Sequence, residues 1–197
     1  MTLTELRQEV YTLTNRPDLV NETLTAIRSA TLKLHTLDYF YKDIFETGIT
    51  FPDPGYLQQL EYRTVVPRWR ALKYLRKTDV SAHQDGEFLT VLSIPEMVED
   101  DYKLNRNNVC YVAGQIVQIR SSDLLQYALL GCYIYPDITE ADYDSWIALD
   151  HPYAIVFEAA SKVFKIIGDT DQFNAFTQLA REEAAMISMS NIQAVGY

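Results

Sequence analysis

Residues that could carry out chemistry are few and scattered in this chain of 197 residues. The three histidines, His35, His83 and His151, stand far apart, and none belongs to a pair with metal-ligand spacing. No glycines have the spacing of a phosphate-binding loop, and no serine lies in a nucleophile-elbow pattern. A Ser–His–Asp triad assembled in space stays open, because its members need not be close in sequence. We therefore assign no catalytic residue, and we expect no cofactor and no metal ion.

Two clusters of acidic residues are candidates for calcium ligands. An EF-hand loop needs glycine at its sixth position and glutamate at its twelfth. Counted from Asp142, these positions hold Ile147 and Tyr153, so the motif fails. We expect both clusters to be solvated loops. Their members are Glu96, Glu99, Asp100 and Asp101 in one cluster, and Asp137, Glu140, Asp142 and Asp144 in the other.

The charge of the chain is strongly acidic and unevenly distributed. The formal net charge is −10, which argues against tight DNA binding because such binding needs a basic surface. Residues 122–197 hold eleven acidic and three basic side chains, whereas residues 1–121 hold sixteen and fourteen. A local basic run in the first part is either a solvated face or a docking face for an acidic partner or a neighbouring subunit. Its members are Arg63, Arg68, Arg70, Lys73, Arg76 and Lys77.

The two cysteines, Cys110 and Cys132, lie in apolar runs and outside any CxxC pair. We expect buried free thiols in a reducing compartment. The first residues contain no apolar signal-peptide core, and no apolar run has the length of a membrane span. The sequence therefore predicts a protein made in the cytoplasm that neither crosses nor binds a membrane.

Aromatic residues are frequent, with 14 Tyr, 8 Phe and 2 Trp. Tyrosine combines a large apolar surface with one hydroxyl, which suits half-buried sheet positions and also subunit interfaces. Without a catalytic motif, this composition favours an assembly protein over an enzyme. A small soluble enzyme whose active site has no sequence motif is the alternative from another class.

Helical periodicity marks the first part of the chain. Thr2 and Glu5 have the spacing of a capping box before an apolar stripe that stops at Pro17. A second stripe starts near Asn21 and predicts a helix that ends shortly before Gly48.

The last part of the chain is also helical by pattern. Pro152 and Gly168 bracket a helix that is apolar around much of its circumference, which is typical of a buried helix. Another helix is predicted over 169–187. Residues 188–197 lack clear periodicity, so we expect a tail that is mobile in the free subunit or, alternatively, packs back on its own helices.

The middle of the chain has the residue types of β-strands. Strands are predicted in 56–66, 88–94, 109–113, 116–120 and 124–135, with turns at Asp85-Gly86 and Gly114-Gln115. The fold class is therefore α+β, with a helical bundle from the N- and C-terminal segments and a β-rich insertion between them. Residues 1–55 and 137–197 form the bundle with its C-terminal tail, and residues 56–136 form the insertion.

Several short packing and turn motifs, together with the helix–β–helix order, resemble one known family. The motifs are LRQEV at 6–10, NRPDL at 15–19, AIRSA at 26–30, DYF at 38–40, DSWIA at 144–148, PYAIV at 152–156, KIIGD at 165–169 and SNI at 190–192. They look like those of the head-to-tail adaptor, connector or neck proteins of tailed bacteriophages.

This resemblance implies a structural, non-enzymatic protein of the virion neck. Such adaptors form a homo-oligomeric, dodecameric ring below the portal protein, contact tail or nozzle proteins, and let the genome DNA pass without specific binding. Another neck or tail ring protein, such as a tail terminator, is the close alternative. The basic run would form a subunit or tail interface. Residues of the C-terminal segment would bind the portal, namely Met189, Ile192, Val195 and Tyr197.

Overall fold

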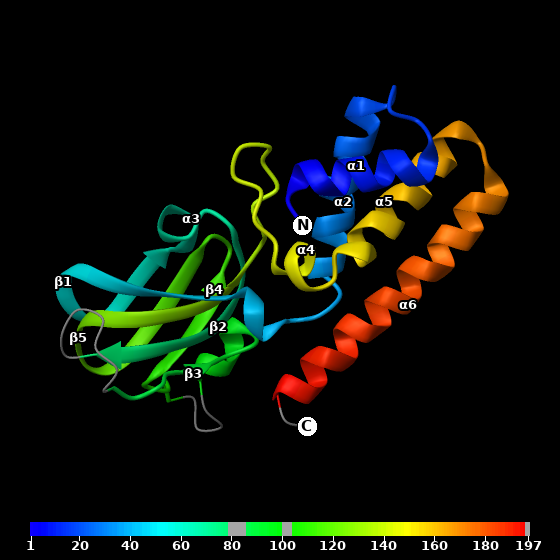
Figure 1. The fold of residues 1–197 in the computed structure, drawn as a ribbon. Coiled ribbons are helices and arrows are strands. Elements are labelled where there is room, and N and C mark those ends of the chain that lie inside the picture. Colours follow the sequence, from blue (N-terminus) through cyan, green and yellow to red (C-terminus); the bar gives the residue numbers. More distant parts are fainter. Residues whose placement is uncertain (79–85, 100–103, 196–197) are drawn as a thin grey trace. The chain divides into compact units, whose positions relative to one another are not determined.

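The computed structural model describes residues 1–78, 86–99 and 104–195, and the chain divides into two units (Figure 1). The helical unit comprises Met1–Asp43 and Tyr135–Tyr197. The sheet unit comprises Ile44–Ile134. Each unit has its own hydrophobic core.

The helical unit begins as its sequence predicts. Thr2 and Glu5 form the capping box, since each side chain accepts a hydrogen bond from the other residue's backbone N–H. Gly168 adopts a φ of 80° and ends the fifth helix in the left-handed conformation that glycine favours. The elements of the unit are α1 (Leu3–Thr14), α2 (Val20–His35), the 3-10 helix η1 (Tyr41–Asp43), α4 (Trp146–Asp150), α5 (Pro152–Ile167) and α6 (Thr170–Val195).

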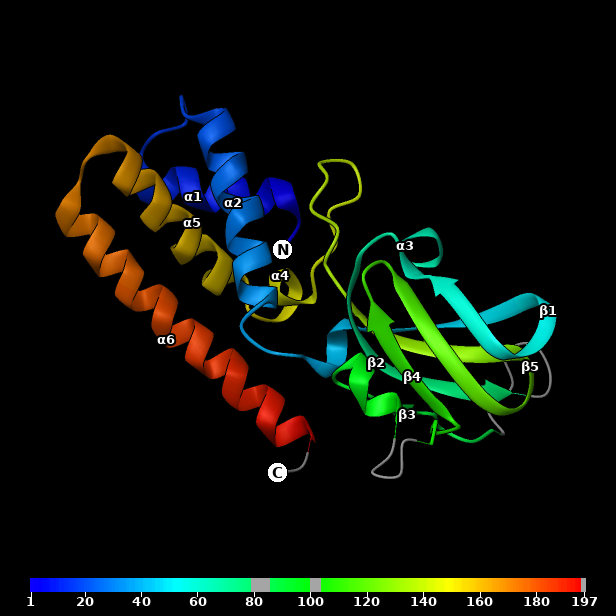
Figure 2. The ribbon, with the colours of Figure 1, turned by 180° about the vertical axis from the view of Figure 1, so that it is seen from behind.

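The prediction of a helical bundle is wrong. α5 is a central helix that contacts α1, α2, α4 and α6, whereas α6 packs chiefly against α5. In both views α1 lies across α2 instead of alongside it (Figures 1 and 2). The reason is the apolar circumference of α5, which buries Ile155, Ala154 and Phe164 on different sides. Such a helix has to be surrounded, so the other helices gather around it at different angles.

Two helix ends differ from the sequence prediction. α2 ends at His35, well before Gly48, because residues from Ile44 onward pair as a strand. α6 continues to Val195 instead of ending at residue 187. Ile187, on the inner side of α6, is 1% exposed and packs in the core of the helical unit.

The sheet unit contains one five-stranded mixed sheet with the order β1-β5-β4-β3, and β2 also pairs with β5. β3 and β4 run parallel, and the other described strand pairs are antiparallel. Its elements are β1 (Ile44–Glu61), α3 (Tyr62–Val65), β2 (Trp69–Thr78), β3 (Thr90–Val91), the 3-10 helix η2 (Pro95–Val98), β4 (Val109–Ala113) and β5 (Ile116–Ile134).

β5 is the central strand, and it is longer than the sequence suggests. Two strands are predicted over 116–120 and 124–135, whereas the structure has one strand of 19 residues. β1 pairs with β5 along both halves, and β4 and β2 pair with its first and second halves. Gly114, with a φ of 62°, forms the predicted turn between β4 and β5. The other predicted turn includes Asp85, which lies outside the described residues.

Two register shifts in β2 place extra residues opposite β5. Trp69 and Ala71 face consecutive residues of β5, so Arg70 is the additional residue there, and Lys73 is the additional residue at the second shift. Tyr74 directly follows Lys73, and its ring lies over the backbone of Gly131 in β5. An aromatic ring over a strand glycine covers backbone that has no side chain of its own.

We predict that Gly131→Ala lowers the free energy of unfolding of the sheet unit by about 1–3 kcal/mol, the usual cost of overpacking. A Cβ at this position would overlap with the Tyr74 ring. Urea unfolding of Gly131→Ala, Tyr74→Leu and the double variant measures the coupling, because the smaller side chain makes room for the methyl group. Strictly additive effects of the two substitutions would contradict this contact.

Candidate functional site

The helical unit contains a buried hydrogen-bond chain from Asp43 through His35 to Ser145. His35 is the last residue of α2, and its Nδ1 lies 2.8 Å from Asp43 Oδ1 at the end of η1. On the other side of the ring, His35 Nε2 lies 2.9 Å from Oγ of Ser145, the N-cap of α4. This Ser–His–Asp order is the one used in acyl transfer.

The surroundings of this chain enclose it. Trp146 Nε1 donates a hydrogen bond of 2.7 Å to Asp43 Oδ1, and the indole packs edge-on against the rings of His35 and Phe40. His35, Asp43 and Ser145 are only 1%, 4% and 5% exposed. Buried polar groups that are hydrogen-bonded in this way fix the segments that carry them.

The Ser145 hydroxyl makes two hydrogen bonds at the start of α4. Its Oγ accepts a hydrogen bond from the backbone N–H of Ala148, as expected of an N-cap, while it also contacts His35. Ser145 borders a surface hollow of about 230 Å³ next to Met1 and Tyr143, but acyl attack would require Oγ to leave its capping position. The chain of side chains therefore acts as a brace between α2, η1 and α4, which we call the His35 brace.

The predicted basic run does not form one uniform face. Lys77 makes ion pairs with Asp123 at 2.9 Å and Glu87 at 3.1 Å. Burial opposes its charge, but the hydrogen bonds to Asp123 and Glu87 outweigh this, and the pKa of Lys77 is raised. Arg76 donates to the Gly86 carbonyl and lies 5.0 Å over the Phe88 ring. These two cations are engaged within the sheet unit.

The other cations of the run lie at irregular positions of the sheet unit. Arg63 is exposed on α3. Nη1 of Arg68, in the loop before β2, is buried with no hydrogen-bond partner among the described residues. Arg70 and Lys73 are the extra residues of β2, and the Lys73 ammonium lies 5.7 Å from the centroid of the Tyr133 ring. Arg63 thus belongs to the helix α3 and Arg70 to the strand β2, and their spacing in the sequence does not predict this difference.

Three of the four predicted portal-binding residues, Met189, Ile192 and Val195, fall on the last turns of α6. Met189 is 63% exposed. Two residues later, Asn191 donates to Asp38 Oδ2 at 3.0 Å and accepts from the backbone N–H of Tyr41 at 3.4 Å. This anchor contradicts a loose tail as far as Asn191 and agrees with the alternative of packing back. The side chains of Ile192 and Val195, and all of Tyr197, lie outside the described part of the chain.

Both cysteines lie in the hydrophobic core of the sheet unit. Cys110 and Cys132 are free and buried, as predicted. Burial raises the pKa of Cys110 to about 12 and that of Cys132 to about 11, so both thiols stay protonated at neutral pH. In 1–78, 86–99 and 104–195, no three His, Cys, Asp or Glu side chains could hold a metal ion. Asp100 and Asp101 of the first acidic cluster lie outside these residues.

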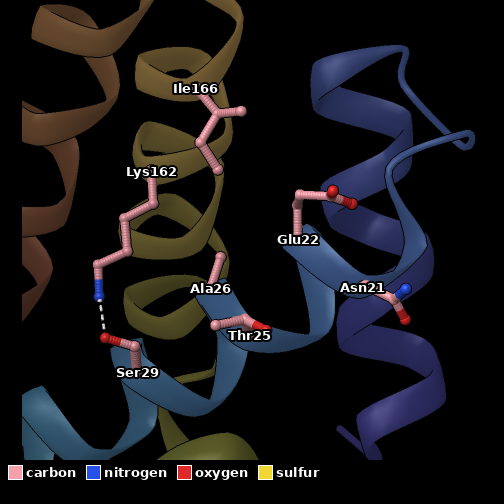
Figure 3. A pocket seen from close by; sticks show the side chains of 7 residues that line it. All are labelled: Asn21, Glu22, Thr25, Ala26, Ser29, Lys162 and Ile166. Atoms are coloured by element: carbon pink, nitrogen blue, oxygen red, sulfur yellow. Dashed lines mark hydrogen bonds between the residues drawn. The ribbon is translucent and has the colours of Figure 1, made fainter.

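The sequence indicated neither the His35 brace nor a groove that lies between α2 and α5 (Figure 3). It has a volume of about 360 Å³. Lys162 of α5 extends along it and donates a hydrogen bond of 2.8 Å to Ser29 Oγ of α2. We call it the Lys162 groove, and its walls include Glu22, Thr25, Ala26 and Ser29 of α2 and Lys162 and Ile166 of α5.

Comparison with models of protein families finds no match, and comparison with curated proteins finds none either. Among the described residues, no helix has the length and apolar character needed to span a membrane.

We predict that Ser145→Ala lowers the free energy of unfolding by about 2–3 kcal/mol, because α4 loses its cap and His35 loses a buried partner. Thermal and urea unfolding measure the loss, with the exposed Ser190→Ala as the control. A fluorophosphonate probe, which labels activated serines, should leave the wild-type chain unmodified. Labelling of Ser145 would contradict the structural role.

Proposed function

We propose that this chain is a structural protein of a tailed-bacteriophage virion, a head-to-tail adaptor. About a dozen copies form a ring below the portal protein, join the capsid to tail or nozzle proteins, and let the genome pass. The observation that carries the proposal is the way both ends of the chain build one helical unit, with a sheet unit inserted between Asp43 and Tyr135. The adaptors that its sequence motifs resemble have the same helix–β–helix order.

The charge of the helical unit supports passage of DNA without binding. Its residues 1–43 and 135–197 hold sixteen acidic and eight basic side chains. Negative charge of this size repels phosphates and forms few of the contacts that release counterions from DNA. A ring lined by neutral and acidic groups lets the duplex slide.

Two other functions are distinguishable from the adaptor. A tail terminator or another neck ring protein would also be a ring, but it would bind the tail and not the portal. A small enzyme is favoured by one observation, the hydrogen bonds of His35 to both Ser145 and Asp43. The fluorophosphonate experiment separates that function from a structural one.

Binding to the portal tests the proposal directly. The purified chain is mixed with the portal protein encoded in the same genome, and the products are measured by native mass spectrometry and negative-stain electron microscopy. We expect a ring of adaptor copies on the portal. Binding to tail proteins without binding to the portal would indicate a tail terminator. Binding to neither would contradict a neck function.

We predict that Arg63→Glu combined with Arg70→Glu weakens ring formation on the portal by at least about tenfold, since arginine is enriched at interfaces and pairs with carboxylates. Arg63 is exposed, and Arg70 is half-buried. Lys165→Glu combined with Arg181→Glu, at two exposed positions of the helical unit, is the control for the same change in net charge. Circular dichroism should show an unchanged fold, and equal loss in the control would contradict a specific interface.

The end of α6 gives a second, independent prediction. Met189→Asp should reduce portal attachment without changing the melting temperature, because Met189 is 63% exposed. Asn191→Ala should instead lower the free energy of unfolding by about 1–2 kcal/mol, because hydrogen bonds to Asp38 and Tyr41 are lost. Portal pull-down and thermal unfolding of both variants separate docking from packing. Normal attachment of Met189→Asp would exclude this residue from the portal interface.

A further inference from the structure

Lys162, at one end of the groove, belongs to a charge cluster that holds two ammonium groups and one carboxylate. Glu158 is 7% exposed, and both of its oxygens accept hydrogen bonds of 2.8 Å from Lys33. Lys162 Nζ lies 3.5 Å from Oε1 of the same carboxylate. Two ammonium groups thus share one carboxylate, in a unit whose overall charge is negative.

Lys162 is the cation of this cluster that lies in the groove. Its side chain is 29% exposed, compared with 55% for Lys33. Burial lowers the pKa of Lys162, Glu158 opposes this, and the charge of Lys33 adds to the lowering. A second carboxylate next to Lys162 would balance the two ammonium groups and stabilise the charged form.

The remainder of the groove is largely apolar. Ala26 and Thr25 form the α2 wall, and Ile166 on α5 is 57% exposed (Figure 3). Glu22 lies seven residues before Ser29 on α2, so about 10 Å of helix separates the acidic end of the groove from the end with Lys162. An occupant therefore meets a cation, then an apolar surface, then an anion.

We propose that the Lys162 groove receives a single carboxylate side chain carried on an aliphatic segment of a partner protein. The carboxylate pairs with the Lys162 ammonium and accepts from the Ser29 hydroxyl, while aliphatic side chains cover Ile166 and Ala26. Glu22 disfavours a second acidic residue at the far end, which sets the direction of the segment. This inference is independent of the adaptor function, because it depends only on the chemistry of α2 and α5.

The test uses a short synthetic peptide of Leu and Ala with one central Glu, and the same peptide with Gln in its place. Binding to the full chain is followed by NMR of the Ile166 methyl groups and of Lys162 Nζ. We expect the Glu peptide to bind about tenfold more tightly than the Gln peptide, as for one charge-assisted hydrogen bond. The pKa of Lys162, which lies next to Glu158 and Lys33 and has Glu22 at the other end of the groove, should rise when the Glu peptide binds.

Variants of the two lysines on α5 identify the site. Lys162→Met should remove the preference for Glu, whereas Lys165→Met, an equal charge change on the exposed side of α5, should keep it. If Lys162→Met does not fold, Ser29→Ala should still weaken binding of the Glu peptide. Equal binding of both peptides, or no binding of either, would overturn the proposal. Hexanoate, a small free carboxylate, is the second probe. If the chain binds hexanoate and neither peptide, the proposal is also overturned, and the groove binds a free carboxylate ligand instead.

Discussion

A helix that is apolar around most of its circumference has to be surrounded, and α5 imposes this requirement on the helical unit. α1 and α2 come from before the sheet unit, and α4 and α6 come from after it. The chain therefore has to leave the helical unit and come back. The sheet unit permits this, because Ile44 at the start of its first strand pairs with Tyr133 near the end of its last strand. The two ends of the unit are therefore neighbours. Close ends are the usual condition for an inserted unit.

The His35 brace strengthens the point where the chain leaves the helical unit. Asp43 is the last residue before β1, and it accepts hydrogen bonds from Trp146 and from the ring of His35. Such a network is costly when one member is missing, because the remaining polar groups stay buried without a partner. It therefore selects a single arrangement of α2, η1 and α4, which apolar packing alone specifies less sharply.

Local signals in the sequence predicted the elements that depend on near neighbours. The capping box of Thr2, the turn at Gly114 and the end of α5 at Gly168 are of this kind. The first half of β1 was missed, because its strand conformation comes from pairing with β5 some eighty residues later. Burial of the cysteines followed from apolar runs. The His35 brace and the Lys162 groove join residues more than one hundred positions apart, so no local pattern announces them.

The central position of β5 sets the order in which the chain can mature on the ribosome. β1, β2 and β4 all pair with a strand that is synthesised after them, so their edges stay open until residue 134 has emerged. α1 and α2 wait still longer, because their apolar stripes need α5. We expect the nascent chain to complete its sheet first and its helices last, and to depend on chaperones while both are exposed.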